Sequence, residues 1–574
     1  MTLGAPGSTY IEGAFAFTDP ELARIATQQG AHAAWMAAFV RDGENAPSMV
    51  TGEFSVGLRD ACGRILLAVD RFSIRSLCFR IRGDVIDVHS RADVVAASDA
   101  SLDNQAIFDY LYAHVIPAPR TIFKGVRRLP AGHCALLSNG KLRVAPWWRP
   151  VFVEDDPAQF AVLRDEFRRL LRSAVADQVD DRAVGCFLSG GTDSSTVAGM
   201  LSEVTGRPAR TFSIGFDAKG YDEMEFARIA ARHFKTDHHE YYVTADDLVA
   251  SIPEVATSYD QPFGNSSVVP SYYCARFARE SGIEHILGGD GGDELFGGNS
   301  RYAKQRIFEA YGRVPPIVRR GLLEPILANH SALSRIAGFA KAASYVDQAR
   351  VPMPDRMQMY NLLTRLGLED VLAPEFLAEV DPGAPLRQMR EVYAAGPSGT
   401  LINRMLAFDW RFTLADNDLP KVVGATSLAG LSVGFPLLDD ALTDFSLKLE
   451  PKFKLKGLQL RWFFKEALRG FLPDEILAKK KHGFGLPFGV WVNSHPALQS
   501  LAFESLRALS QRGIVRKEFI ERLVNHYLPD HPGYYGEMVW VLMTLEQWLG
   551  RPAKRGPSRK PPHATTGDAG SESK

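Results

Sequence analysis

A glycine pair between two apolar runs constrains this chain more than any other feature. The stretch AVGCFLSGGTDSSTVAGM, Ala183–Met200, predicts a buried strand over 183–188, a tight loop, and a helix over 194–204. The glycines allow the backbone to turn sharply and to point successive N–H groups inward, and the start of the helix adds partial positive charge. The sequence therefore predicts an anion-binding loop at the end of a strand.

Asp193 lies just where this predicted helix begins, and there it would repel a bare phosphate. The loop suits phosphate only if a cation binds with it, and Asp193 then supplies one carboxylate to that cation. A Walker loop is excluded because no Gly-Lys-Ser/Thr follows Gly191. A plain strand-to-helix turn explains most glycine pairs, but this full string after an apolar strand is far less common.

A second glycine-rich stretch, LGGDGGDELFGG over Leu287–Gly298, carries Asp290 and Asp293 just after a predicted strand at 285–289. It lacks the alternating oxygen ligands and the closing glutamate of a calcium loop. If both strands belong to one parallel sheet, the two loops emerge at the same edge, and Asp193 and Asp293 can share a Mg²⁺ ion bound to nucleotide phosphates. A solvated acidic loop is the alternative, and a separation beyond roughly 10 Å would exclude a shared ion.

The order of predicted elements indicates an α/β fold. From Asp156 onward helices alternate with strands, which are expected at 183–188, 210–216, 238–243 and 285–289. This alternation is typical of a doubly wound parallel sheet, and the region 300–550 adds further helices. The preceding residues hold short alternating segments and turn signals that predict strands and hairpins. We expect domains over 1–150 and 155–550, and a disordered Pro/Gly/Ser-rich tail over 551–574.

Charge and cysteine content limit the partners. A formal net charge of −1 over 574 residues provides no basic field for nucleic acid or an anionic membrane. The five cysteines form no C-x-x-C pair, which fits buried thiols in a reducing cytoplasm. No signal peptide is recognisable, and no apolar run approaches the roughly 18 residues of a membrane span. We expect a cytoplasmic protein without nucleic-acid or membrane partners, and a homodimer is left open.

Several strings resemble, in order and spacing, the synthetase domain of asparagine synthetase-like amidotransferases. They are FLSGGTDSS, TFSIGF, YDEMEFARIAARHF, GGDGGDELFGGNSRYAK, GFPLLDD and LPDEILAKKKHGFGLPFGVW. This family includes glutamine-dependent asparagine synthetases, β-lactam synthetase and lasso-peptide macrolactam synthetases. The resemblance implies a PP-loop ATP pyrophosphatase domain. It also implies an enzyme that adenylates a carboxylate with ATP and Mg²⁺, releases pyrophosphate, and lets a nitrogen nucleophile attack the acyl-adenylate.

The resemblance also implies roles for residues in the two glycine-rich stretches. Asp193 and Asp293 would bind Mg²⁺, and Asp290 would orient or deprotonate the attacking nitrogen. The nucleotide would contact Leu188, Ser189, Gly190, Gly191, Asp193, Ser194, Ile214, Gly288 and Gly289.

One position departs from the family pattern. In LQLRWFFKEAL the family commonly has a lysine where Arg461 stands, and that lysine stabilises charge during amide formation. Arginine keeps the charge but presents a planar fork in place of a point donor. Lys465 is one helical turn further and is an alternative for the role. Either side chain could instead extend from a helix surface into solvent.

The N-terminal region resembles an Ntn-hydrolase-like glutaminase domain that is shortened and degenerate. Glutamine-hydrolysing members begin Met-Cys-Gly, and the cysteine thiol is the nucleophile. Here position two is Thr2, the first cysteine is Cys62, and the glutamine-binding NGEIYN-type stretch is absent. Thr2 or Ser8 could replace the thiol only if processing gave it a free N-terminus. A wrongly assigned start codon is an alternative explanation for the missing cysteine. We expect a glutaminase-like domain without glutaminase activity.

These patterns predict an ATP-dependent, AMP-forming carbon–nitrogen ligase of asparagine synthetase type. Its cofactors would be ATP and Mg²⁺, and its partners a small-molecule or peptide carboxylate and ammonia or an amine donor. Three alternatives are left open: a peptide or natural-product cyclase, an enzyme that amidates a glycan or surface-polysaccharide carboxylate, and a non-catalytic nucleotide-binding scaffold. The intact aspartates argue against the scaffold, because a scaffold does not need a metal pair.

Overall fold

The structure is a computed structural model that describes residues 1–551, except 98–99, 156–157, 219, 320–344 and 480–484. The tail expected to be disordered lies outside the described residues apart from Arg551. None of the helices in the described ranges combines the length and apolar character needed to cross a membrane.

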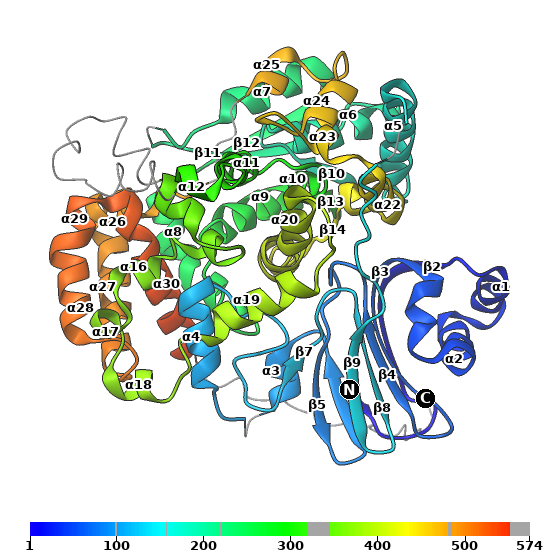
Figure 1. Ribbon diagram of the computed structural model, residues 1–574, viewed down its shortest axis with the longest axis horizontal. Helices are drawn as coiled ribbons and strands as arrows, with labels where there is room; N and C mark the ends of the chain where they lie inside the picture. Colours follow the sequence, from blue (N-terminus) through cyan, green and yellow to red (C-terminus); the bar gives the residue numbers. More distant parts are fainter. Residues whose placement is uncertain (98–99, 156–157, 219, 320–344, 480–484, 552–574) are drawn as a thin grey trace, which may run out of the picture.

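The N-terminal region contains two antiparallel sheets packed face to face (Figure 1). One has the order β2-β3-β4-β8-β9 and the other β1-β6-β5-β7. Their bounds are Thr2–Leu3 (β1), Thr9–Phe17 (β2), Val50–Arg59 (β3), Ile65–Val69 (β4), Cys78–Arg82 (β5), Val85–His89 (β6), Arg127–Arg128 (β7), His133–Ser138 (β8) and Lys141–Pro146 (β9). The α+β sandwich expected from the sequence is confirmed.

Strand β4 shows why its sequence is apolar throughout. Successive side chains of a strand point to opposite faces, so a strand covered on one face alternates between apolar and polar residues. In ILLAV every residue is buried, because Ile65, Leu67 and Val69 face the second sheet while Leu66 and Ala68 face helices. Those helices are Pro20–Gln29 (α1) and Ala31–Asp42 (α2).

The C-terminal region is built on a parallel sheet with the strand order β12-β11-β10-β13-β14. The strands are Val184–Phe187 (β10), Arg210–Phe216 (β11), Asp237–Val243 (β12), His285–Leu287 (β13) and Ser432–Gly434 (β14). Helices cover both faces. Phe160–Ala176 (α5), Thr192–Thr205 (α6) and Met224–Phe234 (α7) form one layer, and Ala245–Ser258 (α8), Val268–Glu280 (α9) and Leu419–Leu428 (α21) the other. This confirms the predicted doubly wound arrangement.

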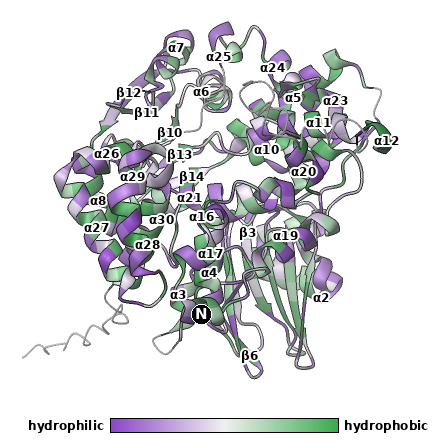
Figure 2. Ribbon diagram, turned by 60° about the vertical axis from the view of Figure 1, so that its left-hand side comes forward, coloured by the Kyte–Doolittle hydropathy of each residue, from purple (hydrophilic) through white to green (hydrophobic). Residues whose placement is uncertain are grey.

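Two boundaries differ from the prediction in ways that shape the site. Helix α6 begins at Thr192, two residues before the predicted start, and its first turn carries Asp193 as the sequence indicates. Strand β13 ends at Leu287, so Gly288 and Gly289 belong to the following loop. The extra helices expected over 300–550 are present in the described part of that range. In Figure 2 the helices around the sheet carry both hydrophilic and hydrophobic residues, as elements with one face against a core do.

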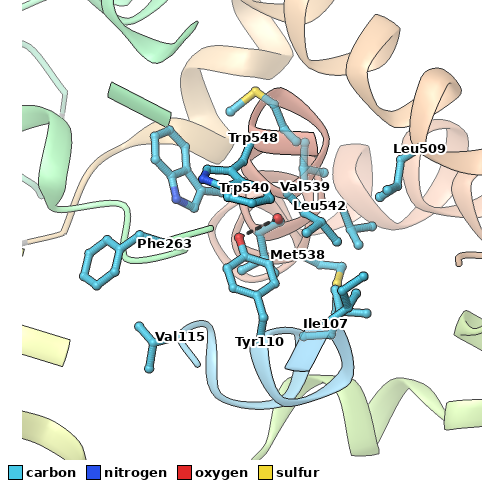
Figure 3. Packing of buried hydrophobic residues seen from close by; sticks show 14 of the residues in the cluster. Ile107, Tyr110, Val115, Phe263, Leu509, Met538, Val539, Trp540, Leu542 and Trp548 are labelled. Carbon is cyan, nitrogen blue, oxygen red and sulfur yellow. Dashed lines mark hydrogen bonds between the residues drawn. The ribbon is translucent and has the colours of Figure 1, made fainter. Parts of the chain in front are cut away.

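A helix of the N-terminal region packs inside the C-terminal core. Helix α4, Asn104–Ala113, lies against α30, Pro532–Leu549, in a buried cluster that also includes residues of α8 and α9. The Tyr110 hydroxyl donates a hydrogen bond to the carbonyl of Val541 at 2.9 Å (Figure 3). Ion pairs join the regions as well, including Arg71 Nε with Asp440 at 3.0 Å. Helix α4 is therefore part of the core of the C-terminal region.

One lysine is buried where the segment joining the two regions meets the C-terminal helices. Lys454 is fully buried at the end of α23, Pro451–Lys454. Its Nζ donates to Asn403 Oδ1 at 2.8 Å, and it lies 4.3 Å from the centre of the Phe152 ring. Burial lowers the pKa of Lys454 to about 7. The unfolded chain therefore binds more protons than the folded chain between this value and the ordinary lysine pKa of about 10.4.

This difference predicts a pH-dependent gain in stability. The difference in the free energy of unfolding, wild type minus Lys454→Met, should rise as pH increases from 7 to about 10. In this range folding requires Lys454 to release its proton, and this cost becomes smaller as the pH approaches the pKa of the unfolded lysine. At pH 7 the methionine variant should be as stable as the wild type or more stable by about 1 kcal/mol. Calorimetric unfolding across this pH range measures both effects. Lys452→Met, at an exposed position in the same helix, is the matched control and should show no such trend.

Candidate active site

A cavity of about 1140 Å³ lies at the carboxyl edge of the parallel sheet, where β10, β11 and β13 end. Both glycine-rich stretches of the sequence line it. The predicted site residues in its wall are Leu188, Ser189, Gly191, Asp193, Ser194, Ile214, Gly289, Asp290, Asp293, Arg461 and Lys465. Gly190 and Gly288 are not part of the lining and instead support it.

The first loop is held by its own serines. The Ser189 N–H donates to Ser194 Oγ at 3.1 Å, and the two hydroxyl oxygens are 3.0 Å apart. Gly190 adopts φ +66, and a Cβ there would collide with the backbone of helix α7. No side chain caps the start of α6, so its first N–H groups remain available to an anionic ligand.

The second loop approaches the first so closely that only glycine fits. A Cβ on Gly289 would lie 2.7 Å from the backbone nitrogen of Ser194. A Cβ on Gly292 would meet the Asp193 carboxylate, with Cγ at 2.6 Å, and Arg461 Nη2 at 2.7 Å. Gly288 supports this arrangement from behind, since its N–H donates to the carbonyl of Gly434 at 2.9 Å. Two of the six glycines in LGGDGGDELFGG, Gly289 and Gly292, therefore lie where a Cβ would meet the first loop or its Asp193 carboxylate.

Arg461 joins the carboxylates of the two loops. Its Nη2 pairs with Asp193 Oδ1, and its Nη1 pairs with Asp293 Oδ1 at 3.0 Å. Nη1 also donates to Thr192 Oγ1 at 2.7 Å. Because one guanidinium reaches both carboxylates, these lie well within the roughly 10 Å that a shared ion allows.

This donor set fits Mg²⁺. The ion binds through one or two carboxylates and fills its other positions with water and substrate phosphates. Among the described residues there is no group of three or more His, Cys, Asp and Glu side chains that could hold a metal alone. A metal here would therefore complete its shell with water, substrate phosphates or both.

The inner wall of the cavity is acidic. Burial raises the pKa of Asp290 to about 6, and the ammonium of Lys421 limits the rise. Lys421 Nζ donates to Asp418 Oδ1 at 3.1 Å. Burial would lower the pKa of Lys421, but the carboxylates of Asp418 and Asp290 outweigh it and raise that pKa. Burial also raises the pKa of Glu294 to about 8, with Asp418 contributing.

Sequence reasoning missed Lys421, Asp418 and Glu294 as lining residues. Lys421 and Asp418 are an ordinary i, i+3 pair of opposite charges, a pattern typical of exposed helices, at the start of α21. Glu294 directly follows Asp293 in the second glycine-rich stretch, and no separate pattern indicates that it lines the site. The one available signal was that the residues after Lys421 are apolar, which indicates a buried helix.

The two lysines near Arg461 have partners of their own. Lys465 Nζ donates to the carbonyl of Leu477 at 2.7 Å, and burial together with the charge of Arg461 lowers its pKa. Lys479 pairs with Glu223 at 3.0 Å and approaches the carbonyl of Gly190 at 3.3 Å. Arg461, and not Lys465, thus contacts the aspartates, and the stretch after Lys479 lies outside the described residues up to 484.

The hydroxyls considered as glutaminase nucleophiles lie elsewhere. The Thr2 hydroxyl donates to Asp87 Oδ1 at 2.5 Å, and the Ser8 hydroxyl donates to the carbonyl of Ala5 at 2.6 Å. Both residues are outside the lining of the cavity, and Thr2 is exposed. Cys62 is exposed on a turn, and the other four cysteines are buried.

Comparisons with known proteins found two matching family models and several similar proteins. The asparagine synthase family model matches residues 166–550, and a glutamine amidotransferase domain model matches 29–148. The chain is 23% identical over 516 residues to glutamine-hydrolyzing asparagine synthetase 1 of Bacillus subtilis, covering 88% of this chain and 78% of that protein. It is 26% identical over 532 residues to a putative glutamine-hydrolyzing asparagine synthetase of Mycobacterium tuberculosis strain H37Rv, covering 87% and 76%. NMN synthetase from Francisella tularensis matches with a TM-score of 0.20 and 14% identity over 36% of this chain and 94% of that one.

The contact between the loops predicts that Gly292 is intolerant of a side chain. Gly292→Ala should lower the thermal midpoint, because overpacking of this kind costs roughly 1–3 kcal/mol. Gly312→Ala is the matched control, since a Cβ there meets nothing within 4 Å, and its midpoint should be unchanged or slightly higher. A Gly292→Ala protein as stable as the control would show that the Asp193 and Arg461 side chains can move away from this position.

Proposed function

The chain belongs to the asparagine synthase family of ATP-dependent carbon–nitrogen ligases, and from that premise we propose how its own residues carry out the reaction. It activates a carboxylate as an acyl-adenylate, releases pyrophosphate, and transfers the acyl group to nitrogen from ammonia or an acceptor amine. The observation that carries this proposal is the convergence of Asp193 and Asp293 on one cationic group at the cavity.

The nucleotide lies across the two loops in this proposal. Leu188, Ile214 and the glycines of the second loop contact adenosine, and the Ser189–Ser194 loop with the start of α6 binds the β- and γ-phosphates. Asp193 and Asp293 hold Mg²⁺, which when bound neutralises phosphate charge and favours departure of pyrophosphate. Arg461, buried beside both aspartates, contributes a fixed positive charge on the same side of the cavity.

Asp290 handles the proton of the attacking nitrogen. A pKa of about 6 leaves its carboxylate largely ionised at neutral pH and still basic enough to accept a proton as the amide bond forms. Lys421, held by Asp418, is close enough to stabilise the ionised form of Asp290. The chain thus separates its tasks, with phosphate binding at one end of the cavity and proton transfer on the inner wall.

The nitrogen comes from a source other than glutamine hydrolysis by this chain. Residues 1–61 contain no cysteine, and the Thr2 hydroxyl is bonded to Asp87 on the opposite side of the sandwich core from α1 and α2. The glutamine amidotransferase model matches from residue 29 onward and leaves 1–28 unmatched. These observations support a retained structural domain.

The proposal is tested by ATP–pyrophosphate exchange across aspartate, other amino acids, uronic acids and peptides. One class of carboxylate should support exchange, whereas production of ADP and phosphate would contradict adenylation. Asp290→Asn should keep exchange with that carboxylate but lose amide formation by about 100-fold or more, because it removes the proton acceptor. Asp474→Asn, an exposed carboxylate at the same cavity, is the matched control and should retain both steps.

The inactive glutaminase domain makes a separate prediction. Incubation with glutamine, with and without ATP and the carboxylate, should release no glutamate above the level of a Thr2→Ala variant, because no nucleophile is positioned for the reaction. Coupled glutamate detection measures this directly. Sustained hydrolysis abolished by Thr2→Ala or Cys62→Ala would identify a nucleophile and refute the assignment.

A further inference from the structure

Arg461 contacts the same two carboxylates that the proposed function assigns to the metal. We infer that its guanidinium and the divalent cation compete for Asp193 and Asp293, so that metal and ATP bind cooperatively and Arg461 sets the strength of their coupling. The inference rests on the proposed function and deepens it, since it concerns how the same site is loaded.

The guanidinium fills the space between the carboxylates. Nη2 pairs with Asp193 and Nη1 pairs with Asp293 at 3.0 Å, so the two ends of the planar fork are in use at once. Its buried Nε has no hydrogen-bond partner among the described residues. A cation that binds the Oδ1 atoms of both carboxylates must therefore displace Arg461 from them.

The protein holds this side chain firmly inside the cavity wall. Arg461 is only 6% exposed and adopts φ +55 at the start of α24, Trp462–Ala467. Its N–H donates to the carbonyl of Lys454 at 2.9 Å, and the guanidinium carbon lies 4.6 Å from the centre of the Phe464 ring. Because Arg461 lines the cavity wall, the groups that replace the carboxylates are those that enter the cavity.

The neighbouring lysines do not replace Arg461 as a partner of the two carboxylates. Lys465 donates to Leu477, Lys479 pairs with Glu223, and Lys421 pairs with Asp418. Of the positively charged side chains described in the cavity lining, Arg461 is the one bonded to both proposed metal ligands. A lysine would supply one charge at one point, whereas the arginine fork spans two carboxylates.

The energetic consequence is a coupling between metal and nucleotide. If the metal alone bound the carboxylates, the buried guanidinium would lose its anionic partners, which is energetically costly. Triphosphate oxygens offer the guanidinium strong charge-assisted hydrogen bonds while the metal takes the carboxylates. Each ligand therefore favours binding of the other, and couplings of this kind typically amount to about 5- to 150-fold in affinity.

The test uses Mn²⁺ as the metal probe, followed by electron paramagnetic resonance, and α,β-methylene-ATP as a nucleotide that cannot form an adenylate. In the wild-type protein the nucleotide analogue should tighten Mn²⁺ binding by about tenfold or more. In Arg461→Gln, Mn²⁺ alone should bind about tenfold tighter than to wild type, while the analogue binds more weakly. If Arg461 had a purely structural role, Arg461→Gln would bind both Mn²⁺ and the analogue more weakly than the wild type.

Controls separate the possible outcomes. Arg469→Gln changes an arginine of the same cavity that pairs with Glu466 and should behave as wild type. Arg461→Lys, a milder change that guards against misfolding, should give intermediate coupling. Equal Mn²⁺ affinity of wild type and Arg461→Gln, with nucleotide-linked binding intact, would overturn the inference and leave the proposed function standing. Absence of Mn²⁺ binding to wild type even with the analogue would instead refute the proposed metal ligands.

Discussion

Repulsion between two carboxylates is the constraint around which this site is organised. Asp193 and Asp293 lie a hundred residues apart in the first turns of two helices, α6 and Gly292–Phe296 (α10), and the parallel sheet brings both to its carboxyl edge. Close approach of the loops needs glycine at positions 289 and 292, and proximity of the charges needs a cation between them. Arg461 satisfies that need in the folded chain, so packing and electrostatics at this edge depend on one another.

Local pattern predicted the framework well. The apolar run before Ser189, the glycine pair and the helix that follows are encoded within one short stretch, and the rule that parallel strands end at one edge placed the second loop beside the first. Tertiary contacts set the details that the sequence could not. In sequence Asp418 and Lys421 look like a surface ion pair, but in the fold both line the cavity. The sequence likewise left Arg461 and Lys465 as alternatives, and only the fold shows that Arg461, which follows a short hairpin of Leu455–Lys456 and Gln459–Leu460, contacts the aspartates.

The domain assignment shows the same limit. Strands and hairpins over the first part of the chain predict a separate sandwich, yet α4 packs within the core of the synthetase region. The loop after it is bound there too, because the carbonyl of Ala118 accepts hydrogen bonds from Gln388 and Arg411. The sequence pattern of an amphipathic helix predicts that one face is buried, but it does not identify the element against which that face packs. This packing gives the N-terminal region a structural role that does not depend on glutamine hydrolysis.

Helix α30 gives this arrangement a consequence for synthesis of the protein. It is the last helix described, and almost every residue over Gly536–Trp548 is buried against elements made much earlier, among them α4 and α8. Until Leu549 has left the ribosome, those earlier helices have no complete partner and their apolar faces stay open to water. The nascent chain must therefore keep the helices of this cluster from aggregating until translation is nearly finished, and a stop codon a few dozen positions early removes buried residues of α30 from the cluster.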